Sequence, residues 1–289
     1  MFPAHLGNNQ ISLRYIPIIC QLLVALMLRM SCAILAVLLL AAPAGAQIAV
    51  PVRESLAVSH QLVVVTAGDW KATNGWLRRF ERNYQGWQII GLPFRVVLGR
   101  GGLGWGRGAH PLPQAGPQKK EGDGRSPAGI FLLPYAFGYA APDSVREIKL
   151  PYVQCSASLE CVDDTNSSYY NVIVDRRSVG APDWNSFEKM RRSDEQYRLG
   201  VFVAHNSPPA QPGAGSCIFL HIWIGPDVPT SGCTAMSAGA MESLLGWLDA
   251  QAHPVLVQLP EAEYQRLQTA WQLPLLQFTN APAAVGTNF

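Results

Sequence analysis

Residues 219–233, FLHIWIGPDVPTSGC, are the most informative stretch of this sequence. The apolar residues at its start predict a short buried strand, and the glycines and prolines that follow predict a loop. The loop ends in the turn Ser231-Gly232, directly before Cys233. Farther on, Ser237 suits the N-cap of a helix with apolar side chains at helical spacing: Met241, Leu244, Leu245 and Leu248. The sequence therefore places a histidine on a strand and a cysteine on a tight turn before a helix.

His221 and Cys233 together suggest nucleophilic chemistry. A cysteine attacks a carbonyl as the thiolate, so it needs a nearby base and a group that stabilises the anion. Twelve positions separate the two residues, and a loop of that length can bring the imidazole to the thiol. The start of the following helix would stabilise the thiolate, and amides around Gly232 and Cys233 would point at a developing oxyanion. The alternative is that both side chains are ordinary members of the core.

A second motif lies upstream at residues 120–131, KEGDGRSPAGIF. Together with His221, Thr230, Gly232 and Cys233, it resembles the L,D-transpeptidase (YkuD-type) family, in which a histidine precedes a Ser/Thr-His-Gly-Cys element. The resemblance covers roughly residues 60–258. A serine, Ser231, stands where the family usually has its second histidine, which indicates a divergent branch.

The resemblance implies an exported enzyme that transfers acyl groups on peptidoglycan, the polymer of the bacterial cell wall. Cys233 would be the nucleophile that forms a thioester with a stem peptide, and His221 would be the general base and acid. Ser231 and Gly232 would shape the oxyanion turn, and Thr230 would contact the substrate. The family requires no metal or cofactor. Two alternatives stay open: an L,D-carboxypeptidase that uses water as the acyl acceptor, and a peptidoglycan-binding module without turnover.

The rest of the sequence predicts a mostly β domain. Its 26 Gly and 22 Pro argue against a helical bundle, and turn residues separate short β-branched runs. The resemblance implies one catalytic domain, residues 47–275, built as a mixed-sheet β-sandwich with a few short helices and followed by a loose tail at 276–289. A second helix is expected at 261–271. The predicted strands are 61–66, 76–81 paired with 87–90 through the turn 83–86, 94–98, 129–133, 170–174, 201–204, 218–222 and 254–258.

The first 46 residues have the character of a targeting segment. They hold no Asp or Glu, and Arg29 precedes the apolar run 33–42 and the small residues Ala44-Gly45-Ala46, as in a Sec-type signal peptide with its cleavage site. Residues 1–26 would then be an over-extended start. The alternative is an uncleaved membrane anchor, because residues 16–42 are long enough to span a bilayer. Both interpretations predict a protein of the periplasm or cell envelope.

The charge balance excludes one class of partner. The chain has 22 basic and 20 acidic side chains, and loss of the two arginines within residues 1–46 leaves a formally neutral chain. Such a chain lacks the electrostatic footprint of a nucleic-acid-binding protein. We expect a monomer that recognises peptidoglycan stem peptides by shape and local chemistry.

Four cysteines follow the targeting segment. In an oxidising compartment, the short polar stretch between Cys155 and Cys161 favours a disulfide within that pair, with two free thiols as the alternative. Cys217 lies four residues before His221 and faces the same way in a regular strand, so it would pack beneath the site or pair with Cys233. The spacing matches no common zinc motif, so a metal site is a weaker alternative, with the ligands His205, Cys217, His221 and Cys233.

Three further stretches each have two interpretations. His205-Asn206 follows the strand 201–204 and would either line the substrate pocket or anchor the loop after it. The charged residues 184–198 would form a solvated helix or lid, or supply an arginine for a substrate carboxylate. Residues 99–104 match a dinucleotide fingerprint literally, but the helix-hostile sequence that follows favours a glycine-rich turn.

Overall fold

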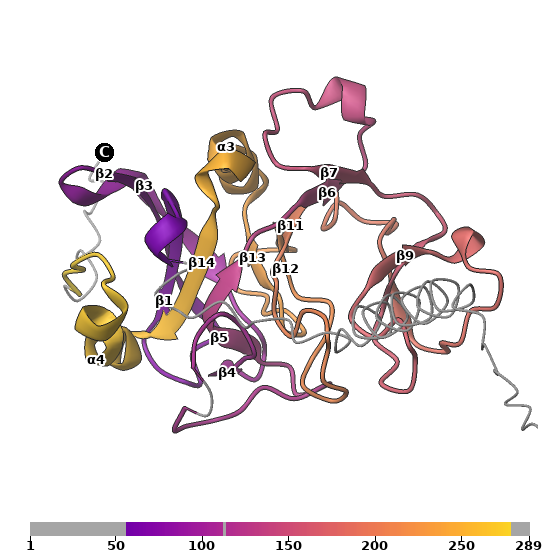
Figure 1. Cartoon of the computed structure of the whole chain (residues 1–289), viewed down its shortest axis with the longest axis horizontal. Helices are drawn as coiled ribbons and strands as arrows, with labels where there is room; N and C mark the ends of the chain where they lie inside the picture. The colour runs from indigo at the N-terminus through magenta and orange to yellow at the C-terminus, as the bar shows by residue number, and fades with distance from the viewer. Residues whose placement is uncertain (1–55, 112–113, 279–289) are drawn as a thin grey trace, which may run out of the picture. The chain divides into compact units, whose positions relative to one another are not determined.

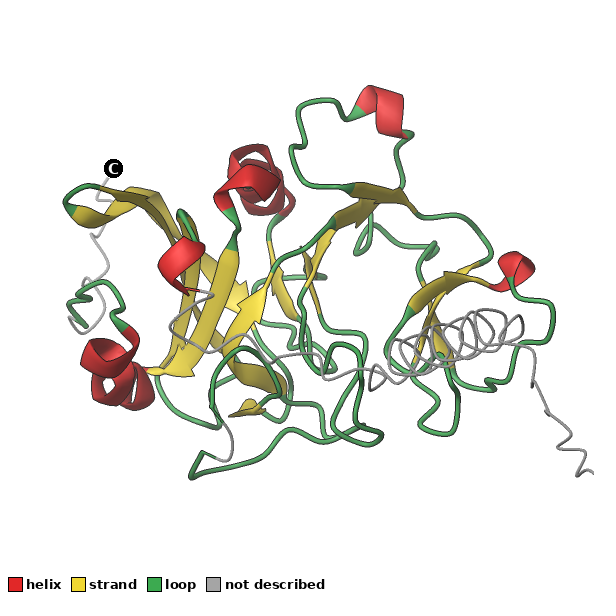
Figure 2. Cartoon of the chain, viewed as in Figure 1, coloured by secondary structure: helices red, strands yellow, loops and turns green. Residues whose placement is uncertain are grey.

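A computed structural model describes residues 56–111 and 114–278, which form one large and one small β-sheet (Figure 1). The large sheet has eleven strands in the order β4-β5-β14-β1-β2-β3-β13-β12-β11-β6-β7, and the small sheet has the order β10-β8-β9. Strands outweigh helices throughout this part of the chain (Figure 2). The predicted mostly β fold with a mixed sheet is confirmed. The predicted signal or anchor, residues 1–46, lies outside the described residues.

The elements have the following bounds. The strands of the large sheet are β1 (Gln61–Ala67), β2 (Asn74–Asn83), β3 (Gly86–Val97), β4 (Leu103–Trp105), β5 (Ser126–Leu132), β6 (Ala136–Gly138), β7 (Tyr152–Gln154), β11 (Leu199–Phe202), β12 (Phe219–Ile222), β13 (Thr234–Met236) and β14 (Val255–Pro260). The small sheet contains β8 (Leu159–Val162), β9 (Ile173–Asp175) and β10 (Phe187–Lys189). The helices are α3 (Ala238–Trp247) and α4 (Glu261–Trp271), with the 3₁₀ turns η1 (Pro142–Ser144), η2 (Arg176–Ser178) and η3 (Ala250–Ala252).

The centre of the large sheet is its most apolar part. β1 pairs in parallel with β14 and antiparallel with β2, and all seven of its residues are buried. A strand covered on both faces becomes a continuous apolar run instead of an alternating one, as the sequence QLVVVTA shows. This buried centre is the scaffold on which the outer strands are aligned.

The β2–β3 hairpin forms as predicted, with Glu81 opposite Gln88 and a turn that ends at Gly86. Gly86 has φ +99°, a conformation that favours glycine. The two predicted strands 87–90 and 94–98 are in fact one strand, because β3 continues through Pro93 to Val97. A register shift opposite, between Leu77 and Arg79 of β2, breaks the regular ladder near the proline.

Both predicted helices are confirmed. Ser237 caps α3 by accepting a hydrogen bond from the Ala240 N–H at 3.2 Å, and the helix buries Met241, Leu244 and Leu245. α4 begins and ends at the predicted residues, 261 and 271. Within the described ranges, the structure contains no helix with the length and apolarity needed to cross a membrane.

Two predictions around the small sheet need correction. The predicted strand 170–174 begins too early: β9 covers residues 173–175, because Asn171 has φ +63° and turns the chain before it. Residues 184–198 form β10 and turns instead of a solvated helix, since β10 pairs antiparallel with β8. In Figure 1, the small sheet lies to the side of β6, β11 and β12.

Three segments that are distant in sequence meet beside α3. β12 pairs in parallel with β13, with His221 opposite Ala235, and β13 pairs with β3 at Val97. A further bridge joins Gly99 to Thr230. This pairing brings the ends of β3, β12 and the loop before β13 to one place, where the candidate site lies.

Candidate active site

Cys233 lies on a tight turn directly before β13. Gly232 has φ +151°, and a β-carbon there would come within 3.2 Å of the Arg125 carbonyl oxygen, so the turn favours glycine. The Thr230 hydroxyl accepts a hydrogen bond from the Gly232 N–H at 3.1 Å and donates to the Cys233 carbonyl at 2.6 Å. The Ser126 hydroxyl donates to the same carbonyl at 2.8 Å. Two hydroxyls therefore fix the backbone that presents the thiol.

The helix after Cys233 begins too far along the chain to act on the sulfur. β13 occupies residues 234–236, and Ser237 is the N-cap of α3. The field of a helix end falls off within the first turn. The expectation that this helix stabilises a thiolate is therefore wrong, and any stabilisation must come from neighbouring groups.

His221 is held in one tautomer by its own strand. Its Nδ1 lies 2.8 Å from the Ile222 carbonyl oxygen. A carbonyl oxygen only accepts hydrogen bonds, so Nδ1 carries the proton and Nε2 of the neutral ring carries a lone pair. The Tyr197 ring packs edge-on against the imidazole, with centroids 5.3 Å apart. His221 is therefore oriented and ready to accept a proton at Nε2.

Cys233 and His221 line one cavity of about 490 Å³. They are almost covered, with exposures of 7% and 4%. The Cys233 Sγ accepts a hydrogen bond from the Phe219 N–H at 3.3 Å and donates to the Cys217 carbonyl at 3.5 Å. The structure thus brings the predicted pair to a common cavity, with the thiol proton directed at a backbone carbonyl.

Both groups are neutral in this arrangement. Burial lowers the pKa of His221 to about 4, although the Ile222 hydrogen bond acts in the opposite direction. Burial also raises the pKa of the Cys233 thiol, and the Glu188 carboxylate raises it further. The Phe219 N–H, Lys119 and Arg192 favour the thiolate but do not overcome burial. The site therefore holds a thiol and a neutral imidazole, not a preformed ion pair.

Charged side chains of both signs line the cavity. Its cations are Arg100, Lys119 and Arg192, and its carboxylates are Glu121, Asp163 and Glu188. Lys119 is paired with Asp123 at 2.6 Å, and Arg192 with Asp194 at 2.7 Å. Each of these two cations already has a carboxylate partner outside the cavity lining.

The three carboxylates are not paired with cations within the described residues. Glu121 accepts from Tyr170 and Ser216, and Asp163 Oδ1 is buried without a hydrogen-bond partner. Glu188 accepts from the Tyr197 hydroxyl at 2.5 Å. Burial raises the pKa of Glu188, and the charge of Asp163 raises it further. These three carboxylates give the cavity acidic groups that can bind a positively charged group of a ligand.

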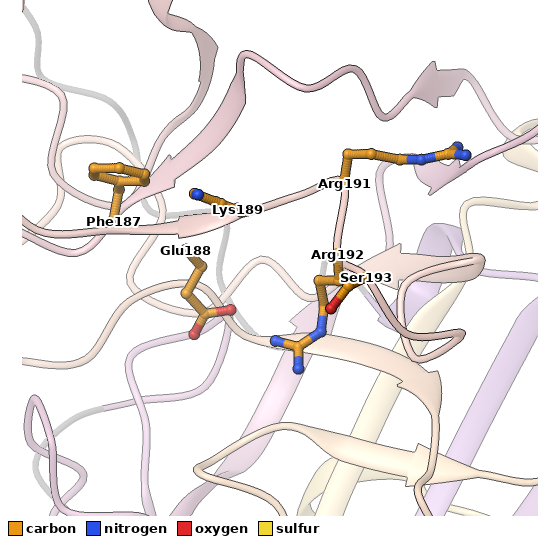
Figure 3. A pocket seen from close by; sticks show the side chains of 6 residues that line it. All are labelled: Phe187, Glu188, Lys189, Arg191, Arg192 and Ser193. Atoms are coloured by element: carbon orange, nitrogen blue, oxygen red, sulfur yellow. The ribbon is translucent and has the colours of Figure 1, made fainter.

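Glu188 lies in β10 and Arg192 in the segment that follows it, and both side chains extend to the same side of this stretch of backbone (Figure 3). They also line a neighbouring cavity of about 530 Å³, together with Phe187, Lys189, Arg191 and Ser193. The two cavities therefore share this pair of charged side chains.

The structure corrects the predicted disulfide. Cys161 is bonded to Cys217, and Cys155 is a buried free thiol. Cys155 directly follows β7 of the large sheet, and its N–H donates a hydrogen bond to the Gly138 carbonyl. Cys161 lies inside β8 of the small sheet. Proximity in sequence thus gave the wrong partner, because the two residues belong to different sheets. The bond also removes Cys217 as a thiolate ligand for the alternative zinc site.

Asn171 is a structural residue that the sequence reasoning missed. Its Oδ1 accepts from the Cys217 N–H at 2.9 Å, and its Nδ2 donates to the carbonyls of His205 and Asn206 at 2.9 and 2.8 Å. The side chain therefore joins the small-sheet segment to two loops of the large sheet. The isolated asparagine in a polar turn gave no signal for this role.

His205 and Asn206 lie outside the lining of the Cys233 cavity. Nδ1 of His205 accepts from the Arg107 N–H at 3.2 Å, and its Nε2 lies 3.0 Å from the Ala214 carbonyl. Burial lowers the pKa of His205 to about 3. The Asn206 side chain bonds Gln211 and Gly215 within the following loop. These positions support the loop-anchor interpretation and not the substrate-contact one.

The remaining predicted residues, Thr230, Ser231 and Gly232, all line the cavity. The Ser231 hydroxyl is exposed and accepts a hydrogen bond from Arg100 NH1 at 2.9 Å. The Gly232 N–H is committed to Thr230, so it does not point freely at an oxyanion. Among the described residues, no acceptor is assigned to the Cys233 N–H, which makes it the better oxyanion donor of this turn.

Comparison with known proteins identifies the family of this chain. A model of the YkuD family, the L,D-transpeptidase catalytic domain, matches residues 77–257. The chain belongs to this family. A search of curated proteins gives no match. Among solved structures, the chain is similar to one described as "Structure of Bdellovibrio bacteriovorus Bd1075", with 14% identity and a TM-score of 0.35.

That likeness covers 75% of this chain and 56% of the Bdellovibrio chain. At this TM-score it supports no statement about activity. The family membership therefore rests on the family model, which spans both motifs of this YkuD domain: residues 120–131 and the segment from His221 to Cys233.

Proposed function

We propose that this YkuD-family chain is a cysteine acyltransferase that acts on peptidoglycan stem peptides. One observation carries the proposal: Cys233, on its glycine turn, shares a cavity with His221, whose Nε2 is free to take a proton. The charged lining suits a substrate with both carboxylate and ammonium groups. A stem peptide that contains a diamino acid and ends in D-alanine has this chemistry.

In the proposed first step, the Cys233 sulfur attacks the carbonyl of the amide that precedes the terminal D-alanine. His221 Nε2 takes the thiol proton during the attack, since the neutral pair has no ion pair to use. The tetrahedral oxyanion accepts a hydrogen bond from the Cys233 N–H. The C–N bond then breaks, the protonated imidazole gives its proton to the departing amine, and the acyl group remains on sulfur as a thioester.

In the second step, an acceptor attacks the thioester. An amine of a neighbouring stem gives its proton to His221 and forms a new amide, and the sulfur leaves and regains a proton. Water in the same role gives a carboxylate, which is the L,D-carboxypeptidase alternative. The acidic lining around Glu188 favours an ammonium-bearing acceptor, and this is our reason for placing transpeptidation first.

The setting of this activity follows from its substrate. Stem peptides lie outside the cytoplasmic membrane, so we propose that the protein acts in the periplasm or cell envelope as a monomer. The targeting segment would deliver it there, either cleaved or retained as an anchor. Neither step draws on a metal or a cofactor.

A covalent adduct on Cys233 is the direct test. Incubation with a carbapenem, an amide-like acylating agent, should add one carbapenem mass to the wild-type protein and none to Cys233→Ala. His221→Gln should acylate at least 100-fold more slowly, since general base catalysis is typically worth about 10²–10⁴-fold. Intact-mass spectrometry over time measures both. Equal labelling of wild type and Cys233→Ala would refute the nucleophile.

Digestion of peptidoglycan after incubation with the protein separates the two enzyme alternatives. New cross-links between third residues support transpeptidation, and shortened stems alone support a carboxypeptidase.

A binding module without turnover is the second candidate, because the thiol is buried and directs its proton at the Cys217 carbonyl. It predicts that peptidoglycan binds to wild type and Cys233→Ala equally and that no adduct forms on either protein. A thioester on the wild type would eliminate this candidate.

A further inference from the structure

We propose that Arg100 binds the terminal carboxylate of the acyl donor and thereby makes the site selective for stems with a free C-terminus. This inference rests on the proposed function, since it assigns a group of that substrate to a residue of the same cavity. Arg100 lies in the glycine-rich turn after β3, outside both motifs that indicated the family.

The backbone of Arg100 is fixed to the cysteine turn. The Arg100 N–H donates to the Thr230 carbonyl at 2.9 Å, and the Thr230 N–H donates to the Leu98 carbonyl at 2.9 Å. The bridge between Gly99 and Thr230 completes this short ladder. Thr230 lies three residues before the nucleophile. Backbone hydrogen bonds to Thr230 therefore set the position of Arg100 relative to Cys233.

The guanidinium of Arg100 points along the same turn. Its NH1 donates to the Ser231 hydroxyl at 2.9 Å, and Ser231 is two residues from Cys233. A guanidinium has five N–H donors, so a single hydrogen bond to a serine leaves most of the planar fork available. A fork of this kind matches both oxygens of a carboxylate.

Arg100 differs from the other cations of the cavity in its ion pairing. Lys119 and Arg192 are neutralised by Asp123 and Asp194. Within residues 56–111 and 114–278, Arg100 forms no ion pair. Because this arginine has no acidic partner among those residues, its charge is available to an acidic group of a ligand bound near the nucleophile.

The chemistry of the acyl donor identifies which group this is. In a peptide that ends at the leaving residue, one carbon separates the scissile nitrogen from the terminal carboxylate. A carbonyl seated at the Cys233 sulfur therefore carries that carboxylate close to the cysteine turn, where Arg100 is held. The cavity also contains Glu121, Asp163 and Glu188, which repel a carboxylate, so Arg100 is the lining group that favours it.

Turnover of two matched substrates tests the assignment: a stem tetrapeptide with a free C-terminal carboxylate and the same peptide as its C-terminal carboxamide. The wild type should prefer the acid about 10- to 100-fold in kcat/KM, the range for a hydrogen-bonded charged pair of about 1.5–3 kcal/mol. Arg100→Gln should remove this preference by slowing the acid alone, with the amide changed less than about threefold.

The matched control is Arg95→Gln. Arg95 is exposed on β3, pairs with Asp227 at 2.8 Å and lies outside the cavity lining, so it should retain the full acid preference. Equal loss of acid and amide turnover in Arg100→Gln would assign Arg100 a structural role. If the wild type turns over the acid and the amide equally well, the proposal is refuted before any variant is measured.

A binding measurement keeps this test separate from the proposed catalysis. Calorimetry compares the two peptides on Cys233→Ala and on Cys233→Ala/Arg100→Gln, where no bond is cleaved. The acid should bind about 10- to 100-fold more weakly to the double variant, and the amide equally to both. If the wild type is not acylated but the difference in acid binding is found, the proposed acyltransferase activity is refuted and the role of Arg100 is retained. If the wild type is acylated but the acid binds both variants equally, only the role of Arg100 is refuted.

Discussion

The cysteine turn and the small sheet meet at the same cavity but are held there in different ways. The turn is fixed by its own neighbours, through the hydroxyls of Thr230 and Ser126 and the parallel register of β12 and β13. The small-sheet region supplies Asp163, directly after β8, and Glu188 on β10, and the Cys161–Cys217 bond joins β8 to the residues before β12. The turn therefore fixes the position of the nucleophile, whereas the small-sheet region supplies two of the three carboxylates that line the cavity.

This difference has a consequence for how such a site can vary. Substitutions in the small sheet can alter the charge that the substrate meets without moving Cys233 or His221. Substitutions in the turn act on the nucleophile itself. The comparison predicts that the two regions lose stability under different conditions. Reduction should weaken the attachment of the small sheet, and acidic pH should destabilise the large sheet.

The largest expected effect is on the attachment. The Cys161–Cys217 bond closes a chain separation of 56 residues, and loss of such a cross-link lowers the free energy of unfolding by about 4 kcal/mol on the chain-entropy model. Dithiothreitol should therefore destabilise the wild type by this amount in urea unfolding, and Cys155→Ser by the same amount. It should have no such effect on Cys161→Ser. A dithiothreitol effect that disappears in Cys155→Ser would show that the bond joins Cys155 instead.

The second effect concerns acidity. Burial lowers the pKa of His110 and His221 to about 4 and that of His205 to about 3, and all three lie in the large-sheet part of the chain. Residues 155–198, which contain the small sheet, have no histidine. A lowered histidine pKa stabilises the fold fully above about pH 6.5, and this stabilisation is lost as the pH falls toward 4.

At pH 5, each buried histidine should therefore cost about 2 kcal/mol of unfolding free energy relative to pH 7.5. His221→Gln should reduce the pH-dependent loss by that amount, whereas His60→Gln, at an exposed position, should keep it. Urea unfolding at the two pH values measures the difference. An unchanged loss in His221→Gln would mean that His221 is not buried in its neutral form.

The elements that were predictable from the sequence are those determined by local pattern. The apolar run of β1, the β2–β3 hairpin and the N-cap of α3 each follow from neighbouring residues. His221 and Cys233 were found because a strand, a loop and a glycine turn are also local signals. They lie in one cavity because the loop that leaves β12 leads back to pair β13 with the same strand.

The contacts that were not predictable join distant segments. The partner of Cys161 depends on how β8 meets the residue before β12, and Asn171 acts through three backbone groups on two other loops. Arg100 looked like part of a glycine turn until the Thr230 ladder placed it beside the cysteine. In each case the residue type permits the role, and only the tertiary arrangement assigns it.

The smallest expected effect tests whether the small sheet acts on the nucleophile through charge. The Glu188 carboxylate raises the pKa of Cys233, so Glu188→Gln should lower that pKa and increase the thiolate fraction at a given pH. Alkylation of Cys233 by iodoacetamide at pH 8, followed by peptide mass spectrometry to separate it from Cys155, should become faster by roughly threefold.

Glu195→Gln is the matched control, because Glu195 is an exposed carboxylate paired with Arg198 at 3.1 Å, outside the lining of the Cys233 cavity. It should leave the alkylation rate unchanged. A glutamine at 188 still offers an oxygen to the Tyr197 hydroxyl, so the ring that packs against His221 keeps its partner. Slower alkylation in Glu188→Gln would therefore mean that Glu188 assists removal of the thiol proton, and the separation between a positioning turn and a charge-setting sheet would no longer hold.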